Sequence, residues 1–182
     1  MRYRLLSALA VGIRAAQTAD QFDHADATHG GLMLIEHTSL TKIASAILAK
    51  AGAPEEQANA VAEHLVEANL KGHDSHGVGM IPSYVKGMLD QQVNPHSHAE
   101  IIKDSNVLVS IDAGTGLGRI VGFEAMDVGI ERADQFGISC IALGNAAHLG
   151  RIGAFAEYCA DHGMVSMHYV NVVGHDPVVV AF

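Results

Sequence analysis

Apolar residues recur at helical spacing in the part of the chain that begins near Ile35. From Ser39 onward they keep the i, i+3, i+4, i+7, i+8 spacing that marks one face of an amphipathic helix. The positions on this face are Leu40, Ile43, Ala44, Ile47 and Leu48. Thr38 or Ser39 can cap the start of the helix, and Gly52 can end it.

A second helix is predicted after Pro54, a residue that suits the first helical turn, with Glu55 and Glu56 favourably placed near its N-terminus. Its apolar stripe consists of Val61, Ala62, Leu65, Val66 and Leu70, and Gly72 ends it. Residues 82–89 predict a short third helix. These three segments form a helical lead-in to the rest of the chain.

Strand and helix patterns alternate beyond Pro95. Strands are predicted over residues 107–112, 138–143 and 164–170. One helix is predicted from the glycine-rich residues 114–118 to about Gln135, between the first two strands, and another over 151–162, between the last two. Alternation of this kind favours an at least partly parallel sheet covered by helices. The expected fold class is therefore α/β, with a helical N-terminal lead-in followed by β-α-β-α-β.

Both ends of the chain depart from this pattern. The apolar run Leu5–Ile13 is too short to span a bilayer, and Arg14 closes it too early for a signal peptide. The apolar run 178–182 is unusual for a solvated terminus, so the α/β part is expected to be truncated at the C-terminus. The expected division is a non-domain extension over 1–32, a helical segment over 33–95 and an α/β segment over 96–182.

Composition narrows the class of protein. Of the 182 residues, 49% are hydrophobic and 17% are charged, which is typical of a globular chain. The formal net charge of -9 argues against a nucleic acid partner, although a local pocket of donors can still bind a small anion. Cys140 and Cys159 lie in apolar stretches, so we expect both to be buried, in a reducing, cytoplasmic setting without a membrane span.

The first candidate site is the run His73-Asp74-Ser75-His76-Gly77, directly after the second predicted helix. It places two imidazoles, a carboxylate and a hydroxyl within five residues, which are the groups that acid–base chemistry uses. The alternative is a helix end followed by a simple turn with an incidental histidine. A metal site is also conceivable, but no third ligand stands at a recognisable spacing.

The second candidate site is the run from Asn145 to Arg151, between a predicted strand and a predicted helix. Ligands of open α/β sheets bind beyond the carboxyl ends of the strands, so His148 stands where a general base would be useful. Gly150 and the amides of Arg151 and Ile152 would open the next helix, and such amides hold anions, including cofactor phosphates. An ordinary loop with a surface histidine remains the alternative.

The glycine-rich run Gly114-Thr115-Gly116-Leu117-Gly118 is a third candidate. Its G-x-G-x-G spacing lacks the third glycine of the dinucleotide fingerprint, and no acidic residue for a ribose follows the next strand. We interpret it as a tight turn with close helix packing.

Four segments resemble the malate/L-lactate dehydrogenase family, which includes ureidoglycolate, sulfolactate and hydroxycarboxylate dehydrogenases and a cyclic imino acid reductase. They are NLKGHDSHGVGMIPSYV (69–85), DAGTGLGRIVGFEAM (112–126), NAAHLGRIGAFAEYCADHG (145–163) and VVGHDPVVVAF (172–182). The form of the first segment is most similar to the hydroxycarboxylate dehydrogenase branch. The resemblance extends from about residue 35 to the end of the chain.

The resemblance implies a fold that binds NAD or NADP without a Rossmann domain, and a small 2-hydroxy or 2-oxo acid as substrate. It implies that His148 is the catalytic base and that Ser75 orients His76, with both beside substrate and cofactor. It further implies cofactor contacts for Gly150, Arg151 and Ile152, no metal, and a homodimer. Tyr84 would line the substrate pocket.

The sequence departs from the family at Met80, where many relatives carry an arginine that would clamp a substrate carboxylate. A bulkier, more apolar hydroxy acid is therefore plausible. Two other functions compete with the oxidoreductase. One is a catalytically inactive chain that acts at most as a dimerisation or folding module. The other is a metal-dependent hydrolase that uses the ligands His73, Asp74, His76 and His148.

Overall fold

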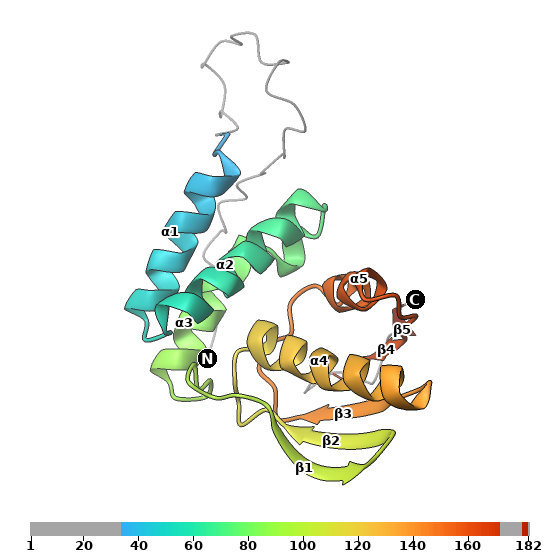
Figure 1. Cartoon of the computed structure of the whole chain (residues 1–182). Coiled ribbons are helices and arrows are strands. Elements are labelled where there is room, and N and C mark those ends of the chain that lie inside the picture. The colour runs from blue at the N-terminus through green and yellow to red at the C-terminus, as the bar shows by residue number, and fades with distance from the viewer. Residues whose placement is uncertain (1–33, 172–179, 182) are drawn as a thin grey trace, which may run out of the picture.

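Three helices form the first part of the computed structural model, which describes residues 34–171 and 180–181 (Figure 1). They are α1 (His37–Lys50), α2 (Glu55–Leu70) and α3 (Ile81–Leu89). Their shared core contains Ala44, Leu48, Val61, Leu65, Tyr84 and, from the following segment, Leu117. The predicted helical lead-in is thus confirmed. The predicted extension over 1–32 and most of the final apolar run lie outside the described residues.

The prediction for the cap of α1 is wrong. Glu36 caps this helix, and its Oε2 atom accepts the backbone N–H of Ser39 at 2.8 Å. The hydroxyl of Thr38 donates to the same carboxylate. A carboxylate at this position accepts a free N–H of the first turn, as a hydroxyl also can. Its negative charge in addition interacts favourably with the positive end of the helix dipole, which a hydroxyl does not.

The main sheet has three strands in the order β1 (Glu100–Ser105), β2 (Leu108–Asp112) and β3 (Cys140–Gly144). β1 runs antiparallel to β2, while β2 and β3 are parallel. Helix α4 (Gly118–Phe136) connects β2 to β3 and covers one face of the sheet (Figure 1). Its Ala125 packs on Val109 and Ile111 of β2, which form a second core. The predicted partly parallel sheet is confirmed.

Strand β1 was not predicted, because its sequence EIIKDS has no alternation of apolar and polar residues and every one of its side chains is exposed. Strand β3 is also more exposed than its apolar sequence led us to expect. It lies at the edge of the three-stranded sheet, so Cys140 is exposed and the prediction of two buried cysteines holds only for Cys159. Both cysteines are free thiols.

Helix α5 (Gly153–Asp161) follows β3, close to the predicted bounds. The third predicted strand, over 164–170, is wrong in its extent. Only β4 (His168–Tyr169) forms, and it pairs antiparallel with β5 (Val180–Ala181) in a separate two-stranded sheet. Val165 is fully exposed, so the apolar residues before β4 have no covering layer among the described residues.

The glycine-rich loop after β2 makes a tight turn and close packing, as interpreted from its spacing. Gly114 has a φ of +53°. A side chain at Gly118 would place its Cβ only 2.3 Å from the carbonyl oxygen of His148. Ala147 N–H also donates to the carbonyl of Gly116 at 3.0 Å. The loop therefore supports the backbone that carries His148.

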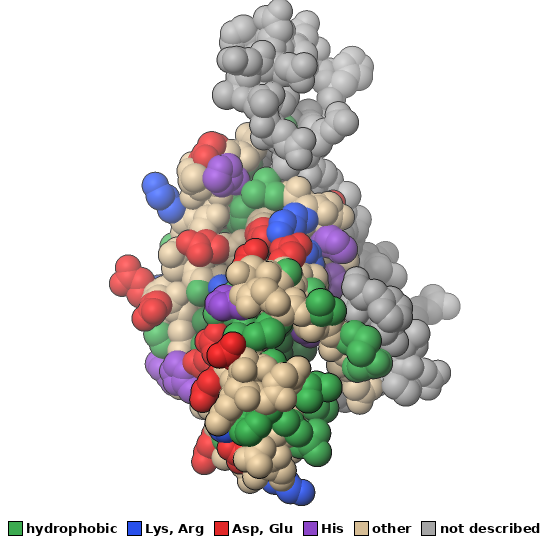
Figure 2. Space-filling model, turned by 45° about the vertical axis from the view of Figure 1, so that its right-hand side comes forward, with side chains coloured by type: hydrophobic (Ala, Val, Ile, Leu, Met, Phe, Trp, Pro, Cys, Tyr) green, Lys and Arg blue, Asp and Glu red, His purple; other side chains and the backbone are tan. Residues whose placement is uncertain are grey.

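Acidic side chains are more frequent than basic ones on the face shown in Figure 2, in keeping with the net charge of -9. In the segments that the structure describes, no helix is both long and apolar enough to cross a membrane.

Candidate active site

The two histidine motifs meet in space. His76 lies in a short 3₁₀ turn (Asp74–His76) after α2, and His148 lies in the loop after β3. Their imidazole rings stack with centroids 5.3 Å apart and an angle of 29° between the ring planes. The structure thus brings together two candidate residues that are 72 positions apart in the sequence.

Asn69 holds the His76 turn, a role that the sequence analysis missed. Its Nδ2 donates to Asp74 Oδ1 at 2.6 Å, and its Oδ1 accepts the backbone N–H of Val78 at 2.8 Å. A Cβ at Gly77 would lie 2.1 Å from Asn69 Oδ1, so glycine is required there. The carboxylate of Asp74 is therefore engaged in the turn, while Ser75 Oγ lies 2.8 Å from His76 Nδ1.

Tyr84 joins α3 to the His148 loop. Its side chain is 5% exposed, and its hydroxyl lies 3.1 Å from both the Nδ1 atom and the carbonyl oxygen of His148. Burial raises the pKa of Tyr84, so the hydroxyl stays protonated. A hydroxyl has one hydrogen, so it can serve both atoms if it donates to the carbonyl and accepts from Nδ1–H, which is the tautomer in which Nδ1 does not accept the nearby N–H of Gly150. Neutral His148 then keeps a lone pair on Nε2.

The pKa of His148 lies below its usual value, mainly because burial penalises the imidazolium and secondly because His76 is near. An imidazole with a lowered pKa is uncharged at neutral pH and can accept a proton. His148 follows β3 in the chain, so its imidazole lies beyond the carboxyl end of that strand, where ligands of open α/β sheets bind. The arrangement is chemically suited to general acid–base catalysis.

Gly150, Arg151 and Ile152 lie between His148 and the start of α5 at Gly153. Gly150 adopts a φ of +76°, and its N–H lies 3.3 Å from His148 Nδ1, to which it can donate only in the tautomer that carries its hydrogen on Nε2. No side chain caps the N-terminus of α5.

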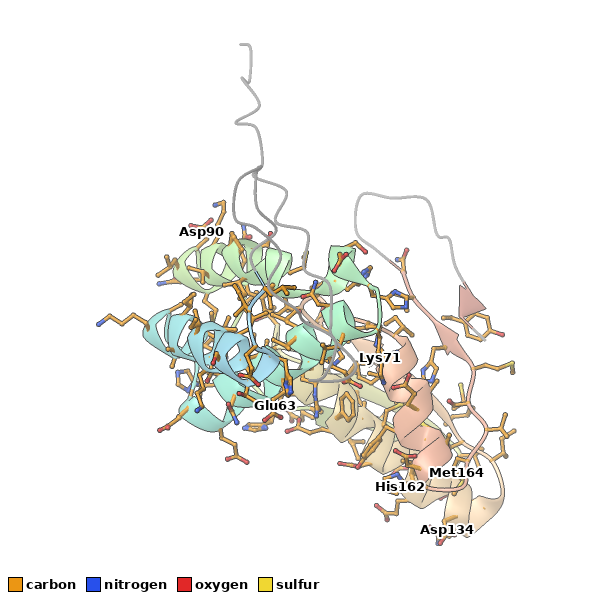
Figure 3. All side chains as sticks on the ribbon, turned by 90° about the horizontal axis from the view of Figure 1, so that it is seen from above. Glu63, Lys71, Asp90, Asp134, His162 and Met164 are labelled. Carbon is orange, nitrogen blue, oxygen red and sulfur yellow. The ribbon has the colours of Figure 1, made fainter. Side chains whose placement is uncertain are left out.

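The side chain of Arg151 is not presented to a ligand in this structure. It is 7% exposed, and its guanidinium makes two hydrogen bonds to Glu157, at 2.9 and 2.6 Å. Lys71, at the end of α2, contacts Glu67 at 2.6 Å and Glu157 at 2.5 Å. Lys71 lies beside α5 in the view from above (Figure 3). These ion pairs tie the end of α2 to α5, and so the His76 turn to the His148 loop.

The remaining candidates are less informative. Met80 is partly buried and packs against the helical core. His73 is exposed. Within the described ranges, no group of three or more histidine, cysteine or acidic side chains is arranged to hold a metal ion.

Fold and site define a class of α/β protein in which two histidine loops meet at the carboxyl end of a parallel strand pair. Residues 35–182 match the family model described as malate/L-lactate dehydrogenase, so the chain belongs to that family.

Individual relatives agree with the family match. Hydroxycarboxylate dehydrogenase B of Escherichia coli is 46% identical over 136 residues, which make up 75% of this chain and 38% of that protein. L-lactate dehydrogenase of Cupriavidus necator is 37% identical over 150 residues, covering 82% of this chain and 43% of the relative. The solved malate dehydrogenase of Pyrococcus horikoshii has a TM-score of 0.68 at 35% identity, covering 71% of this chain and 37% of its own. The chain therefore spans less than half the length of these relatives.

Proposed function

We propose that this chain carries the acid–base part of an oxidoreductase that transfers a hydride between NAD or NADP and a small 2-hydroxy or 2-oxo carboxylic acid. The observation that carries the proposal is the buried contact of Tyr84 with His148, next to the stacked ring of His76. The names of the relatives support the substrate class, since all of those reported above act on 2-hydroxy acids.

His148 is the proposed base. In the oxidation direction its Nε2 lone pair removes the hydroxyl proton of the substrate, and in the reduction direction the imidazolium returns that proton to the carbonyl oxygen. We propose that the reacting tautomer is Nδ1–H, in which Tyr84 accepts from Nδ1 and donates to the His148 carbonyl, and not the tautomer in which Nδ1 accepts from the N–H of Gly150. Nε2 is thereby left as the basic atom.

His76 is proposed to stand beside substrate and cofactor, with its ring orientation set by Ser75. The hydroxyl of Ser75 lies 2.8 Å from His76 Nδ1, which leaves the other ring nitrogen free for a ligand. A positive charge on His76 would disfavour protonation of His148, because the two rings are stacked.

The turn before α5 fits a phosphate-bearing cofactor, since the uncapped helix start leaves its backbone amides for an anion. We propose that Gly150, Arg151 and Ile152 hold the cofactor through this backbone, because the guanidinium of Arg151 is bound to Glu157. When bound, the nicotinamide supplies the hydride acceptor or donor. His76 would contact it from the other motif.

The substrate is proposed to be more apolar than malate. Met80 cannot form the bidentate pair that an arginine makes with a carboxylate, so a substrate site at the His76 turn would favour a bulkier acid. A panel of 2-oxo acids that differ in side-chain size measures this preference directly.

We also propose that the protein is a homodimer in a cytoplasmic setting. Ile43, Ile47 and Leu89 are large apolar side chains that remain exposed on α1 and α3, and they line a groove that could accept a second copy. The two free thiols are compatible with a reducing compartment. Analytical ultracentrifugation measures the oligomeric state.

A second function is an inactive module for dimerisation or folding. The observation that favours it is the exposed apolar groove formed by Ile43, Ile47 and Leu89. Fluorescence titration with NADH and NADPH distinguishes the two. Saturable binding to the 182-residue chain that is weakened by His148→Ala supports the oxidoreductase, and absence of binding favours the module.

Catalysis itself is tested in a hybrid enzyme. Residues 35–171 replace the matching segment of the E. coli hydroxycarboxylate dehydrogenase B, which supplies the remaining part of the fold. We expect this hybrid to oxidise NADH or NADPH with at least one 2-oxo acid. The unaltered E. coli enzyme is the positive control for the assay.

A further inference from the structure

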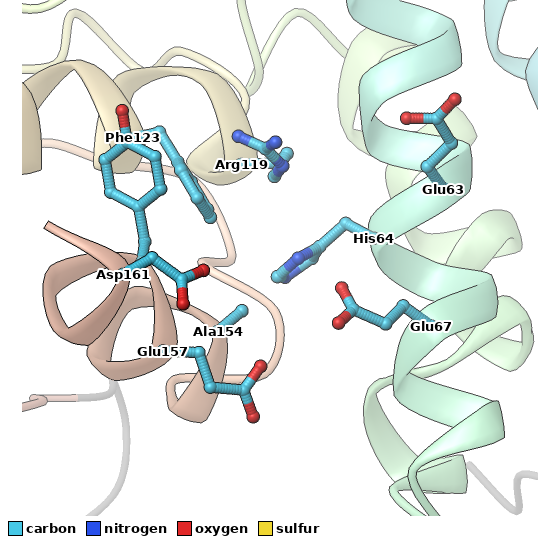
Figure 4. Close-up of a pocket in the computed structure, with 9 residues that line it drawn as sticks. Glu63, His64, Glu67, Arg119, Phe123, Ala154, Glu157 and Asp161 are labelled. Carbon is cyan, nitrogen blue, oxygen red and sulfur yellow. The ribbon is translucent and has the colours of Figure 1, made fainter.

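A buried histidine outside the proposed acid–base pair lies at the base of a pocket of about 220 Å³ between α2, α4 and α5 (Figure 4). This residue, His64, reaches from α2 toward Arg119 and Ala154. It is 3% exposed, and its Nε2 atom has no hydrogen-bond partner among the described residues. Buried polar atoms without a partner are rare, so the position requires a physical reason.

The ring of His64 packs directly on the backbone of Gly150. A Cβ at Gly150 would lie 2.2 Å from His64 Nε2 and 2.5 Å from its Cδ2. Gly150 also has a φ of +76°, a conformation that L side chains rarely adopt. Only glycine fits here, and the imidazole fills the space beneath it.

Two phenylalanines hold the other side of the ring. The centroids of Phe123 and Phe155 each lie 6.3 Å from that of His64, and 4.9 Å from one another. Phe155 is itself seated against Gly122, where a Cβ would lie 2.6 Å from the phenyl ring. The imidazole is therefore fixed between α4, α5 and the loop.

From this packing we propose that His64 is a positioning residue, which fixes the backbone of Gly150 and through it the orientation of His148. The N–H of Gly150 lies 3.3 Å from His148 Nδ1, so a movement of Gly150 changes the surroundings of that atom. The importance of His64 for catalysis rests on the proposed function, in which His148 is the base.

The uncharged form of His64 suits this role. The pKa of His64 is lowered to about 4, mainly by burial and secondly by the charge of Arg119, while Glu67 and the Leu149 backbone act in the opposite direction. A neutral ring can pack between phenyl groups without the cost of burying an unpaired charge.

The test follows the ring nitrogens of His148 in the ¹⁵N-labelled 182-residue chain by long-range proton–nitrogen NMR, with His148→Gln to assign them. We expect one dominant His148 tautomer in the unaltered chain. His64→Ala should give averaged shifts of the two nitrogens, because Gly150 loses its support, and His64→Phe should restore the unaltered pattern. Val61→Ala is the matched control: it is equally buried on α2 but packs in the helical core.

Gly150→Ala provides a second route to the same perturbation with His64 intact, and should also average the two shifts. Unchanged His148 signals in a folded His64→Ala chain would overturn the proposal, and so would an equal change in Val61→Ala. The cofactor titration of the unaltered chain is separate. If NADH and NADPH do not bind, the proposed function fails, while the NMR comparison still decides whether His64 positions His148.

Discussion

Tyr84 Oη lies 3.1 Å from His148 Nδ1 and 3.1 Å from the carbonyl oxygen of the same residue. One buried hydroxyl thus fixes both the ring and the backbone of the proposed base. The contact also connects the helical part of the chain to the loop beyond the sheet, because Tyr84 belongs to α3. The family resemblance pointed to Tyr84 as a pocket residue, whereas the structure engages its hydroxyl with His148.

Tyr84→Phe removes this hydroxyl and keeps the ring in the core. We expect kcat of the hybrid enzyme to fall about 10- to 100-fold, which corresponds to about 1.4–2.7 kcal/mol of lost transition-state stabilisation. The KM for the oxo acid should change much less, because the hydroxyl is bound to His148 and not to the substrate. Steady-state kinetics measures both. An unchanged kcat would show that Tyr84 does not govern the base.

Low pH should destabilise the folded chain. The pKa of His64 falls to about 4, mainly by burial, and burial also lowers the pKa values of His148 and His168. The unfolded chain therefore binds more protons below about pH 6.5, and the free energy of unfolding decreases as pH falls from there toward 4. His64 alone accounts for about 3 kcal/mol of this loss.

Urea denaturation at several pH values measures this dependence. His64→Phe should remove a large part of the loss between about pH 6.5 and 4. From about pH 4.5 downward Glu157 contributes as well, because its pKa is lowered to about 2, chiefly by its hydrogen bond to Arg151. A pH slope that is identical in His64→Phe would refute the assignment to His64.

The ion pairs between α2 and α5 should contribute to stability. Glu157→Gln removes the carboxylate that binds Arg151 twice and also contacts Lys71. We expect a loss of about 1–2 kcal/mol, reduced from that of a fully buried pair because Glu157 is half-exposed. Lys86→Gln breaks the exposed pair with Asp90 and is the control, with an expected loss below about 0.5 kcal/mol. Equal losses in the two variants would contradict this account.

Gly118 should not tolerate a side chain. Gly118→Ala would press its Cβ against the carbonyl of His148, which lies 2.3 Å away, and thereby displace the loop. We expect both a lower melting temperature and a loss of kcat in the hybrid enzyme. Gly79→Ala is the matched control, because nothing lies within 4 Å of a Cβ there. Normal kinetics in Gly118→Ala would show that the loop accommodates the methyl group.

Helical periodicity predicted the first part of the fold well, because Ala44 and Leu48 of α1 pack with Val61 and Leu65 of α2, although Ile43 and Ile47 of the predicted face remain exposed. The sheet was harder to predict. Strand β1 has no alternation, and the apolar residues around Val165 resemble a strand although they lie exposed. Whether each of these two segments forms a strand depends on which other strand lies beside it in space, and the local sequence pattern does not contain this information.

The sequence placed His76 and His148 in loops but could not bring them together without the family resemblance. His64 and Asn69 were missed, since both lie on a helix that was judged by its apolar stripe alone. A signal was present: both are polar residues next to apolar core positions on α2, His64 beside Leu65 and Asn69 beside Ala68. Buried polar residues on such a face are worth examining as supports of a nearby loop.

The central claim is that His148 is the acid–base group. The most direct measurement compares NAD(P)H oxidation by the hybrid enzyme and by its His148→Gln variant at a saturating concentration of the preferred 2-oxo acid. We predict a fall in kcat of about 10²- to 10⁴-fold, the usual contribution of a positioned acid or base. Circular dichroism verifies that the variant is folded. A folded variant that retains the kcat of the unaltered hybrid would contradict the account.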